Sequence, residues 1–211
     1  MKTKPHTLHY KGKVVERVQY MDVELEQSIN IIDSFPKLFD YIKDNKHTLS
    51  RILEIGSNRG GLTFTISELY GEPIETISYD IDQSRLVMKN KYPDVCKANR
   101  VDFRLGDCFS STVTNEIKNF IQNPGLSLVL CDGGQKCREF NTFALMLKDG
   151  DIIMLHDYAD TPEDFKPLAK KNIWLWHEST YAGISKAVEE HKLTRVLRDE
   201  FKTSVWGVFQ K

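Results

Sequence analysis

The sequence lacks long hydrophobic runs, and this limits the classes of protein to which it can belong. Its longest uninterrupted apolar run is Phe143–Leu147, far short of the roughly 20 residues that span a bilayer. No apolar stretch follows the basic residues near the N-terminus, which argues against a secretory signal. We therefore expect a cytoplasmic protein with no membrane partner.

The sequence also lacks metal-type cysteine spacing and an excess of one charge. Its four cysteines form neither CxxC pairs nor Cys/His zinc patterns, so we interpret them as reduced thiols. Lys+Arg 29 against Asp+Glu 30 gives a net charge of −1, which disfavours a nucleic-acid partner because such proteins usually carry a basic excess. Repeats, low-complexity tracts and linkers are absent too, so we expect one domain over residues 1–211, with residues 1–48 as an N-terminal hairpin and helix extension.

What the sequence does contain is an alternation of short β-branched runs and helix-like stretches. The predicted strands are Arg51–Ile55, Thr76–Tyr79, Val101–Leu105, Leu126–Cys131, Asp151–Leu155, Thr194–Leu197 and Ser204–Phe209. The predicted helices among them are Leu62–Tyr70, Gln83–Lys91, Val113–Ile121, Arg138–Leu147 and Ile184–His191. Strands separated by helices build βαβ units and a parallel sheet. The last two strands have no predicted helix between them, so they should pair antiparallel.

These elements predict an α/β fold with a Rossmann-like, doubly wound sheet of seven strands. The expected strand order is 3-2-1-4-5-7-6, with one antiparallel strand. Upstream of this sheet, Leu8–Tyr10 and Val14–Val18 predict a small hairpin, and a helix follows it. That helix carries Phe35, Leu38, Phe39 and Ile42 on one face.

The first core strand ends in a glycine turn, Glu54-Ile55-Gly56-Ser57-Asn58-Arg59-Gly60-Gly61. A glycine turn that leads into a helix lets backbone N–H groups approach a ligand. The dinucleotide pattern G-x-G-x-x-G is not met, because Asn58 stands at its second glycine. A ligand without a pyrophosphate would tolerate this change, and a purely structural turn remains the alternative.

The next strands also end in acidic or glycine residues. Asp80 follows Gly56 by 24 residues, which is near the spacing at which a carboxylate reaches ribose hydroxyls. The third strand ends in Gly106-Asp107-Cys108 and the fourth in Asp132-Gly133-Gly134. Because open α/β sheets bind ligands at this edge, four such ends together predict a binding site.

Together these motifs resemble the class I S-adenosylmethionine-dependent methyltransferases. The stretch from Asp132 through Leu155-His156-Asp157-Tyr158 is similar to the small-molecule and sugar O-methyltransferases, a subgroup that includes macrocin and cephalosporin-type tailoring enzymes. Two departures from the pattern are Asn58 in the first motif and Gln135, where this subgroup often has His. The resemblance implies that S-adenosyl-L-methionine is the cofactor. The residues that it implies for cofactor binding are Glu54, Gly56, Ser57, Asn58, Asp80, Ile81, Asp107, Cys108 and Asp132.

Within that subgroup, Gly56–Asn58 would line the methionine moiety, Asp80 the ribose, and Asp107 with Cys108 the adenine. Acidic residues after strands four and five hold magnesium in the metal-dependent relatives, so Asp132 and Asp157 are the metal candidates here. His156 replaces the first acid of the second pair, and imidazole suits manganese better than magnesium.

Methyl transfer to a hydroxyl requires removal of a proton, which gives His156 and Asp157 candidate catalytic roles. The sequence leaves open whether a divalent metal (Mg or Mn) or a metal-free His156 base does this, and a purely structural histidine is a third reading. The residues 158–179 between this strand and the last long helix are expected to cover the substrate, with Trp174 and Trp176 contacting it or packing the segment down. Lys166, Lys170 and Lys171 could meet an anionic acceptor or form a solvated cluster.

The expected function is methyl transfer to a hydroxyl of a small molecule or sugar. The alternatives are a non-catalytic cofactor-binding module or a methyltransferase for nucleic acid or protein. Amino-methylating nucleic-acid enzymes usually carry Asp/Asn-Pro-Pro-aromatic after strand four, where this chain has Asp132-Gly133-Gly134-Gln135. A cytosine C5 enzyme would need a nucleophilic cysteine, and Cys131 should point into the sheet instead. Oligomeric state is open, with a homodimer as one option.

Overall fold

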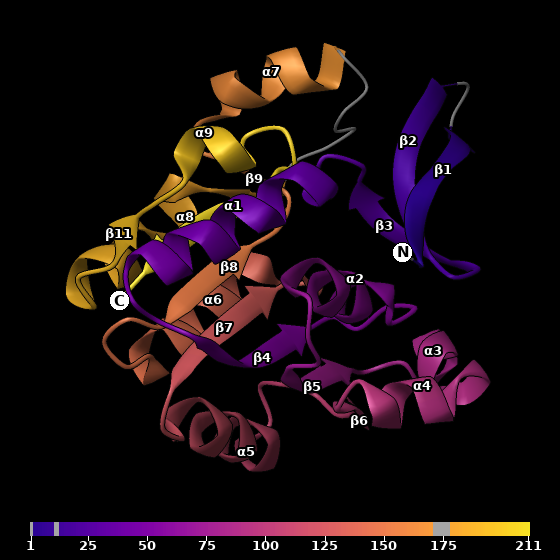
Figure 1. The fold of residues 1–211 in the computed structure, drawn as a ribbon. Helices are drawn as coiled ribbons and strands as arrows, with labels where there is room; N and C mark the ends of the chain where they lie inside the picture. Colours follow the sequence, from indigo (N-terminus) through magenta and orange to yellow (C-terminus); the bar gives the residue numbers. More distant parts are fainter. Residues whose placement is uncertain (1, 11–12, 171–177) are drawn as a thin grey trace.

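A computed structural model describes residues 2–10, 13–170 and 178–211, and its centre is a seven-stranded sheet (Figure 1). In sequence order, the strands of this sheet are β4 (Leu49–Ile55), β5 (Glu75–Asp80), β6 (Val101–Leu105), β7 (Leu126–Cys131), β8 (Ile152–Leu155), β11 (Thr194–Arg195) and β12 (Gly207–Gln210). Their spatial order is β11-β12-β8-β7-β4-β5-β6. Strand β12 pairs antiparallel with both β8 and β11, whereas the other pairs are parallel. The predicted sheet is confirmed.

Helices cover both faces of this sheet. The helices are α1 (Ile31–Asp44), α2 (Gly61–Tyr70), α3 (Val87–Lys91), α4 (Pro93–Ala98), α5 (Ser111–Gln122), α6 (Lys136–Phe143), α7 (Pro162–Lys170), α8 (Tyr181–Glu190) and α9 (Arg198–Phe201). Successive strand residues point to opposite faces, so Ile52 packs with α1 and α2 while Leu53 packs with α5, α6 and α8. Leu128 and Val129 divide between the two faces in the same way. Both faces are buried, which explains the nearly continuous apolar character of the central strands.

The N-terminal region forms a separate three-stranded antiparallel sheet. The strands predicted near residues 8–10 and 14–18 are present and longer, as β1 (Thr3–Tyr10) and β2 (Lys13–Tyr20). A third strand, β3 (Val23–Ser28), was not expected from the sequence. Figure 1 shows this sheet beside the carboxyl ends of the core strands, where it packs against α2. It therefore adds a wall to the edge of the core sheet at which the sequence places a site.

The predictions for two segments between core elements were wrong in detail. The helix expected over Gln83–Lys91 is split into a 3-10 turn, Gln83–Arg85, and α3, because the Asp82 side chain caps the turn through Ser84 N. The segment between Leu197 and Ser204, expected to lack a helix, contains α9. A single helical turn is short enough to leave the antiparallel pairing of β11 and β12 intact. The last strand begins at Gly207 and not at Ser204.

The segment after β8 has more structure than the loop expected there. It contains β9 (Tyr158–Ala159), α7 and β10 (Ser179–Thr180), and β9 pairs parallel with β10. Trp174, Trp176 and Lys171 lie outside the described residues, as does the side chain of Lys170, so the expectations for them have no structural counterpart. Lys166 is exposed and lies 3.8 Å from Glu163, consistent with a solvated charge. None of the helices in the described ranges has the length and apolar character needed to cross a membrane.

Candidate functional site: a cleft at the carboxyl edge of the sheet

A cavity of about 1040 Å³ lies at the carboxyl ends of β4 to β8. One side is formed by the turns that follow the core strands, and the opposite side by residues 24–28 of β3 together with Arg17 of β2. The cavity is continuous from the glycine turn after β4 to the acidic residues after β7 and β8. We call its two parts the nucleotide end, at the turns after β4, β5 and β6, and the polar end, at the residues after β7 and β8.

The glycine turn after β4 is required by a close approach between two backbone segments. Gly56 has φ +89°, and a Cβ there would lie 2.3 Å from the carbonyl oxygen of Asp132. The turn therefore packs directly on the end of β7, which no other residue type would allow. Asn58 also adopts a left-handed backbone, with φ 45°, a conformation that asparagine tolerates better than most residues. The backbone of this turn, without a middle glycine, still faces the cavity.

Asp80 holds the glycine turn and the end of β5 together. Its Oδ2 accepts a hydrogen bond from Asn58 N at 2.9 Å, and its Oδ1 accepts one from Asp82 N at 2.9 Å. A carboxylate oxygen has two acceptor positions, so each oxygen can still accept a hydroxyl from a ligand. The neighbouring Ile81 is 76% exposed and lines the cavity, which gives this end an apolar surface beside the carboxylate.

Glu54 lies beneath the glycine turn and is fully buried. Its Oε2 accepts a hydrogen bond from Thr63 Oγ1 at 2.7 Å and another from the hydroxyl of Ser78. The Ser78 hydroxyl also lies 2.6 Å from the hydroxyl of Ser57. Burial raises the pKa of Glu54 to about 7, an increase that the two hydroxyl donors only partly offset. Glu54 and Ser57 therefore support the turn from below through this hydroxyl network.

The turns after β6 and β7 complete the strand ends. Asp107 is exposed and accepts a hydrogen bond from Phe109 N at 2.9 Å, while Cys108 is buried beside it. Glu139 of α6 is 2% exposed and accepts hydrogen bonds from Gly133 N and Gln135 N at 3.1 and 3.0 Å. Glu139 thus fixes the Asp132-Gly133-Gly134 turn, a role that the sequence analysis missed.

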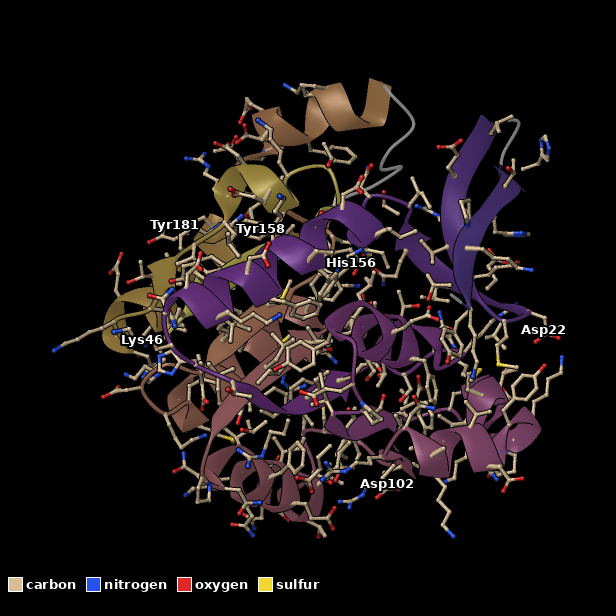
Figure 2. All side chains as sticks on the ribbon, in the orientation of Figure 1. Asp22, Lys46, Asp102, His156, Tyr158 and Tyr181 are labelled. Atoms are coloured by element: carbon tan, nitrogen blue, oxygen red, sulfur yellow. The ribbon has the colours of Figure 1, made fainter. Side chains whose placement is uncertain are left out.

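Asp132, His156 and Asp157 converge at the polar end. His156 Nδ1 lies 2.9 Å from Asp132 Oδ1 and 3.7 Å from Asp157 Oδ2 (Figure 2 marks His156 at the centre of the molecule). His156 Nε2 is buried and has no hydrogen-bond partner among the described residues. The Asp132 contact therefore orients the ring through Nδ1 and leaves Nε2 as the nitrogen without a partner.

Two residues remote in sequence fix this arrangement. Gln27 of β3 donates from Nε2 to Asp132 Oδ2 at 2.7 Å, and its Oε1 accepts from Trp206 Nε1 at 3.1 Å. The Trp206 ring in turn packs on the His156 ring, with 4.7 Å between centroids. The four side chains form a closed circuit that links the N-terminal sheet to the core. Sequence reasoning missed Gln27 and Trp206, because neither follows a parallel core strand or belongs to a motif.

A buried lysine lies among the carboxylates. Lys136, the first residue of α6, places Nζ 3.2 Å from Asp157 Oδ2 and 3.9 Å from Asp132 Oδ1. The same ammonium contacts Glu178 Oε2 at 2.6 Å and donates to the Gly133 carbonyl at 3.1 Å. The side chain of Lys136 is only 7% exposed, so this cation is part of the site's interior.

The charges of the polar end shift its pKa values in one consistent pattern. Burial alone would lower the pKa of Lys136 and of His156, but the Asp132 and Asp157 carboxylates outweigh burial and raise both. Burial raises the pKa of Asp157, and the charges of His156 and Lys136 partly oppose this. Both bases are thus held toward their protonated forms by the carboxylates.

The thiols near the cavity are poor nucleophiles. Burial raises the pKa of Cys108 to about 12, and it raises the pKa of the fully buried Cys131 as well. Because the thiolate is the nucleophilic form, both residues are inert at neutral pH. A reaction that uses a cysteine of this cleft as nucleophile is therefore disfavoured.

One oxygen or nitrogen from each of Asp132, His156 and Asp157 lies within 4.8 Å of the others, as a shared metal ion would require. Most of these atoms already have partners. Both Asp132 oxygens accept hydrogen bonds, from Gln27 and His156, and Asp157 Oδ2 pairs with Lys136. An ammonium among the ligand oxygens does not fit a divalent ion in this arrangement. No chemical step is therefore assigned to a metal.

All eleven of the expected site residues line the one cavity. They are Glu54, Gly56, Ser57, Asn58, Asp80, Ile81, Asp107, Cys108, Asp132, His156 and Asp157. The lining residues that sequence reasoning missed include Arg17, Gln27, Lys136, Glu139 and Glu178. All five lie outside the strand-end turns on which the sequence analysis relied. The one available signal was the alternation Val23-x-Leu25, which is typical of the strand that carries Gln27.

Comparisons with known proteins find similarity in structure alone. No protein-family model and no curated protein matches the chain. Among solved structures, a proposed O-methyltransferase from Nostoc punctiforme aligns with a TM-score of 0.53 and 13% identity, over 85% of this chain and 55% of that chain. A proposed caffeoyl-CoA O-methyltransferase from Staphylococcus aureus aligns with a TM-score of 0.49 and 12% identity, over 84% of this chain and 82% of that chain. At these identities the first similarity supports the Rossmann-like methyltransferase fold, and the activity must be argued from the site.

Proposed function

We propose that this chain is an S-adenosylmethionine-dependent methyltransferase that acts on a hydroxyl of a small molecule or sugar. The observation that carries the proposal is the continuity of the cleft. A nucleotide-type end with a glycine turn and a ribose-type aspartate opens directly onto a buried Asp–His pair. A methyl donor and an acceptor must lie in one space for an in-line transfer, and this cleft supplies that space.

At the nucleotide end, the chain's own groups suit each part of the donor. The backbone of Gly56–Asn58 would face the methionine moiety, and the Asp80 carboxylate would accept both ribose hydroxyls. Asp107 and Cys108 follow β6, where the adenine would lie, and the exposed Ile81 offers it apolar contact. Glu54 and Ser57 hold the glycine turn in place through their hydrogen bonds with Ser78.

At the polar end, His156 is the group that takes the acceptor's proton. Asp132 holds Nδ1, so Nε2 would receive the proton as the acceptor oxygen bonds to the methyl carbon, once the acceptor reaches this buried atom. When bound, the donor would supply the methyl group from its sulfonium and would leave as a neutral thioether. Asp157, 3.7 Å from the ring, stabilises the imidazolium that forms. Because the pKa of His156 is raised above 6.5, turnover should fall as the pH drops through that raised value.

The wall opposite the turns suits a polar acceptor. Arg17, Glu24 and Glu26 line it, and Gln27 connects it to Asp132. Such groups can hydrogen-bond to several hydroxyls of a sugar or polyol. The Nostoc punctiforme protein, a proposed O-methyltransferase, is consistent with a hydroxyl as the methyl acceptor.

The first test is binding of S-adenosylhomocysteine, measured by titration calorimetry. Removing the ribose acceptor in Asp80→Ala should weaken binding by about 10- to 150-fold, the equivalent of about 1.5–3 kcal/mol for a hydrogen bond to a charged group. The matched control is Asp102→Ala, an exposed acid on β6 that does not line the cavity. No binding by the wild-type protein, or equal affinity in Asp80→Ala, would contradict the proposed donor site.

The second test separates an enzyme from a binding module. Transfer of a labelled methyl group should be screened over sugars, catechols, nucleotides and small acids. Transfer to a hydroxyl that is lost in His156→Ala supports the proposal. A protein that binds S-adenosylhomocysteine yet transfers to no acceptor in the screen would favour the binding module.

A further inference from the structure

We propose that the ammonium of Lys136 supplies the fixed positive charge of the polar end, and that no divalent metal binds there. This inference rests on the proposed function for its meaning, because it says how that reaction site balances its acidic groups. It concerns a lysine that lies four residues after Asp132 and belongs to no strand-end motif.

Lys136 Nζ is surrounded by oxygen atoms. Four oxygens lie within 4 Å of it, from Glu178, Gly133, Asp157 and Asp132, at 2.6, 3.1, 3.2 and 3.9 Å. They come from the ends of β7 and β8, from the turn before α6 and from the residue before β10. An ammonium with three N–H donors is thus held by the kind of oxygen shell that otherwise collects a metal ion.

Few ligand atoms of Asp132, His156 and Asp157 remain without a partner and so able to bind a divalent ion. Asp132 Oδ1 faces His156 Nδ1, and Asp132 Oδ2 accepts from Gln27 Nε2. Asp157 Oδ2 faces the ammonium. A divalent ion bound to Asp157 Oδ2 would have to displace the ammonium of Lys136, and the displaced ammonium would stay close because the side chain of Lys136 is buried.

The positive charge of Lys136 balances the two carboxylates of the polar end. Two carboxylates that both lie within 4 Å of one imidazole nitrogen, as Asp132 and Asp157 do, repel one another unless a cation lies between them. Lys136 Nζ lies 3.2 Å from Asp157 Oδ2, the same oxygen that lies 3.7 Å from His156 Nδ1, so the ammonium holds Asp157 beside His156. Lys136 is a positioning residue here, since its described contacts are with Asp132, Gly133, Asp157 and Glu178 and none is with the reacting atoms.

The test is titration of the folded protein with Mn²⁺, followed by the loss of the electron paramagnetic resonance signal of the free ion. The wild-type protein and Lys136→Arg should bind no Mn²⁺ up to about 1 mM. Lys136→Gln removes the charge and should bind one Mn²⁺ per chain. Its dissociation constant should lie at least about tenfold below the limit of about 1 mM set for the wild-type protein. Adding Asp157→Asn to Lys136→Gln should abolish that binding; asparagine suits this position, whose φ is 51°. Lys186→Gln, an exposed lysine of α8, is the control and should behave like the wild-type protein.

Several results would overturn the proposal. One Mn²⁺ per chain in the wild-type protein or in Lys136→Arg, lost in Asp157→Asn, would show that the ammonium does not exclude the ion. No binding in folded Lys136→Gln, or binding that survives Asp157→Asn, would show that Lys136 does not occupy a metal's place. The first comparison does not require Lys136→Gln to fold. S-adenosylhomocysteine titration of the same samples tests the proposed function separately, because donor binding is tested at Asp80, which has no contact with Lys136 or Asp157 among the described residues.

Discussion

The two ends of the cleft are built by different means. The nucleotide end consists of turns that directly follow β4, β5 and β6. These turns are held by side-chain contacts to backbone, as in Asp80 with Asn58 N, and by the buried hydroxyl network of Glu54. The polar end consists of side chains from β3, α6, β7, β8 and the segments before β10 and β12. Its central contact, Gln27 to Asp132, joins residues 105 apart in the sequence.

This difference explains how each end fails or tolerates change. A turn of fixed backbone geometry depends on residues that permit that geometry, so substitutions there act through sterics. A buried polar circuit depends on every partner being present, so substitutions there leave unpaired groups or charges. Changes at the two ends should therefore give separable effects on donor binding and on turnover.

The largest effect is expected where the two ends touch, at Gly56. The Cβ in Gly56→Ala would lie 2.3 Å from Asp132 O, a backbone atom that cannot rotate away, and the residue would also keep φ +89°. We expect a loss of more than about 3 kcal/mol in the free energy of unfolding, measured by urea denaturation, together with loss of donor binding. Gly134→Ala is the matched control, since a Cβ there meets nothing within 4 Å, and its stability should change by less than about 0.5 kcal/mol. Equal effects of the two substitutions would contradict the close approach.

The second-largest expected effect concerns the nucleotide end alone, and it is a dependence of stability on pH. Glu54 has a folded pKa of about 7 against an ordinary glutamate pKa of 4.5, so the folded state holds its proton over a range in which the unfolded state has lost it. Stability therefore falls as the pH rises from about 4.5 to 7. Glu54→Gln removes this dependence, so the wild-type protein should lose about 3 kcal/mol relative to the variant between pH 4.5 and 8. Parallel stability profiles of the two proteins would rule out the raised pKa.

The same contrast decides what could be predicted from the sequence. The order of the core sheet and the acids at its edge follow from local signals, because parallel strands bring all of their carboxyl ends to one side. Asp80 could be placed this way from its distance to Gly56. Lys136 and Gln27 could not, because their partners are set by how α6 and β3 pack on the core. Short elements were missed as well, since α9 is a single turn whose four residues carry no periodic signal.

The smallest effect isolates the polar end and should leave the nucleotide end unchanged. Gln27→Met keeps the length of the side chain but removes the donor to Asp132 and the acceptor for Trp206 Nε1. The unpaired indole N–H and carboxylate oxygen should lower the free energy of unfolding by about 1–2 kcal/mol. Turnover of an acceptor should fall because Asp132 no longer holds His156 in one orientation, while S-adenosylhomocysteine should bind as before.

The matched control for Gln27→Met is Gln19→Met on the adjacent strand, whose amide donates to the Met21 carbonyl two residues away. It should change neither stability by more than about 0.5 kcal/mol nor turnover. If Gln27→Met weakened donor binding as strongly as it lowered turnover, the circuit of Gln27, Asp132, His156 and Trp206 would serve the whole cleft. The division into two independently built ends would then be wrong. A contact that only orients His156 toward the acceptor should not change the affinity for S-adenosylhomocysteine, which carries no methyl group to transfer.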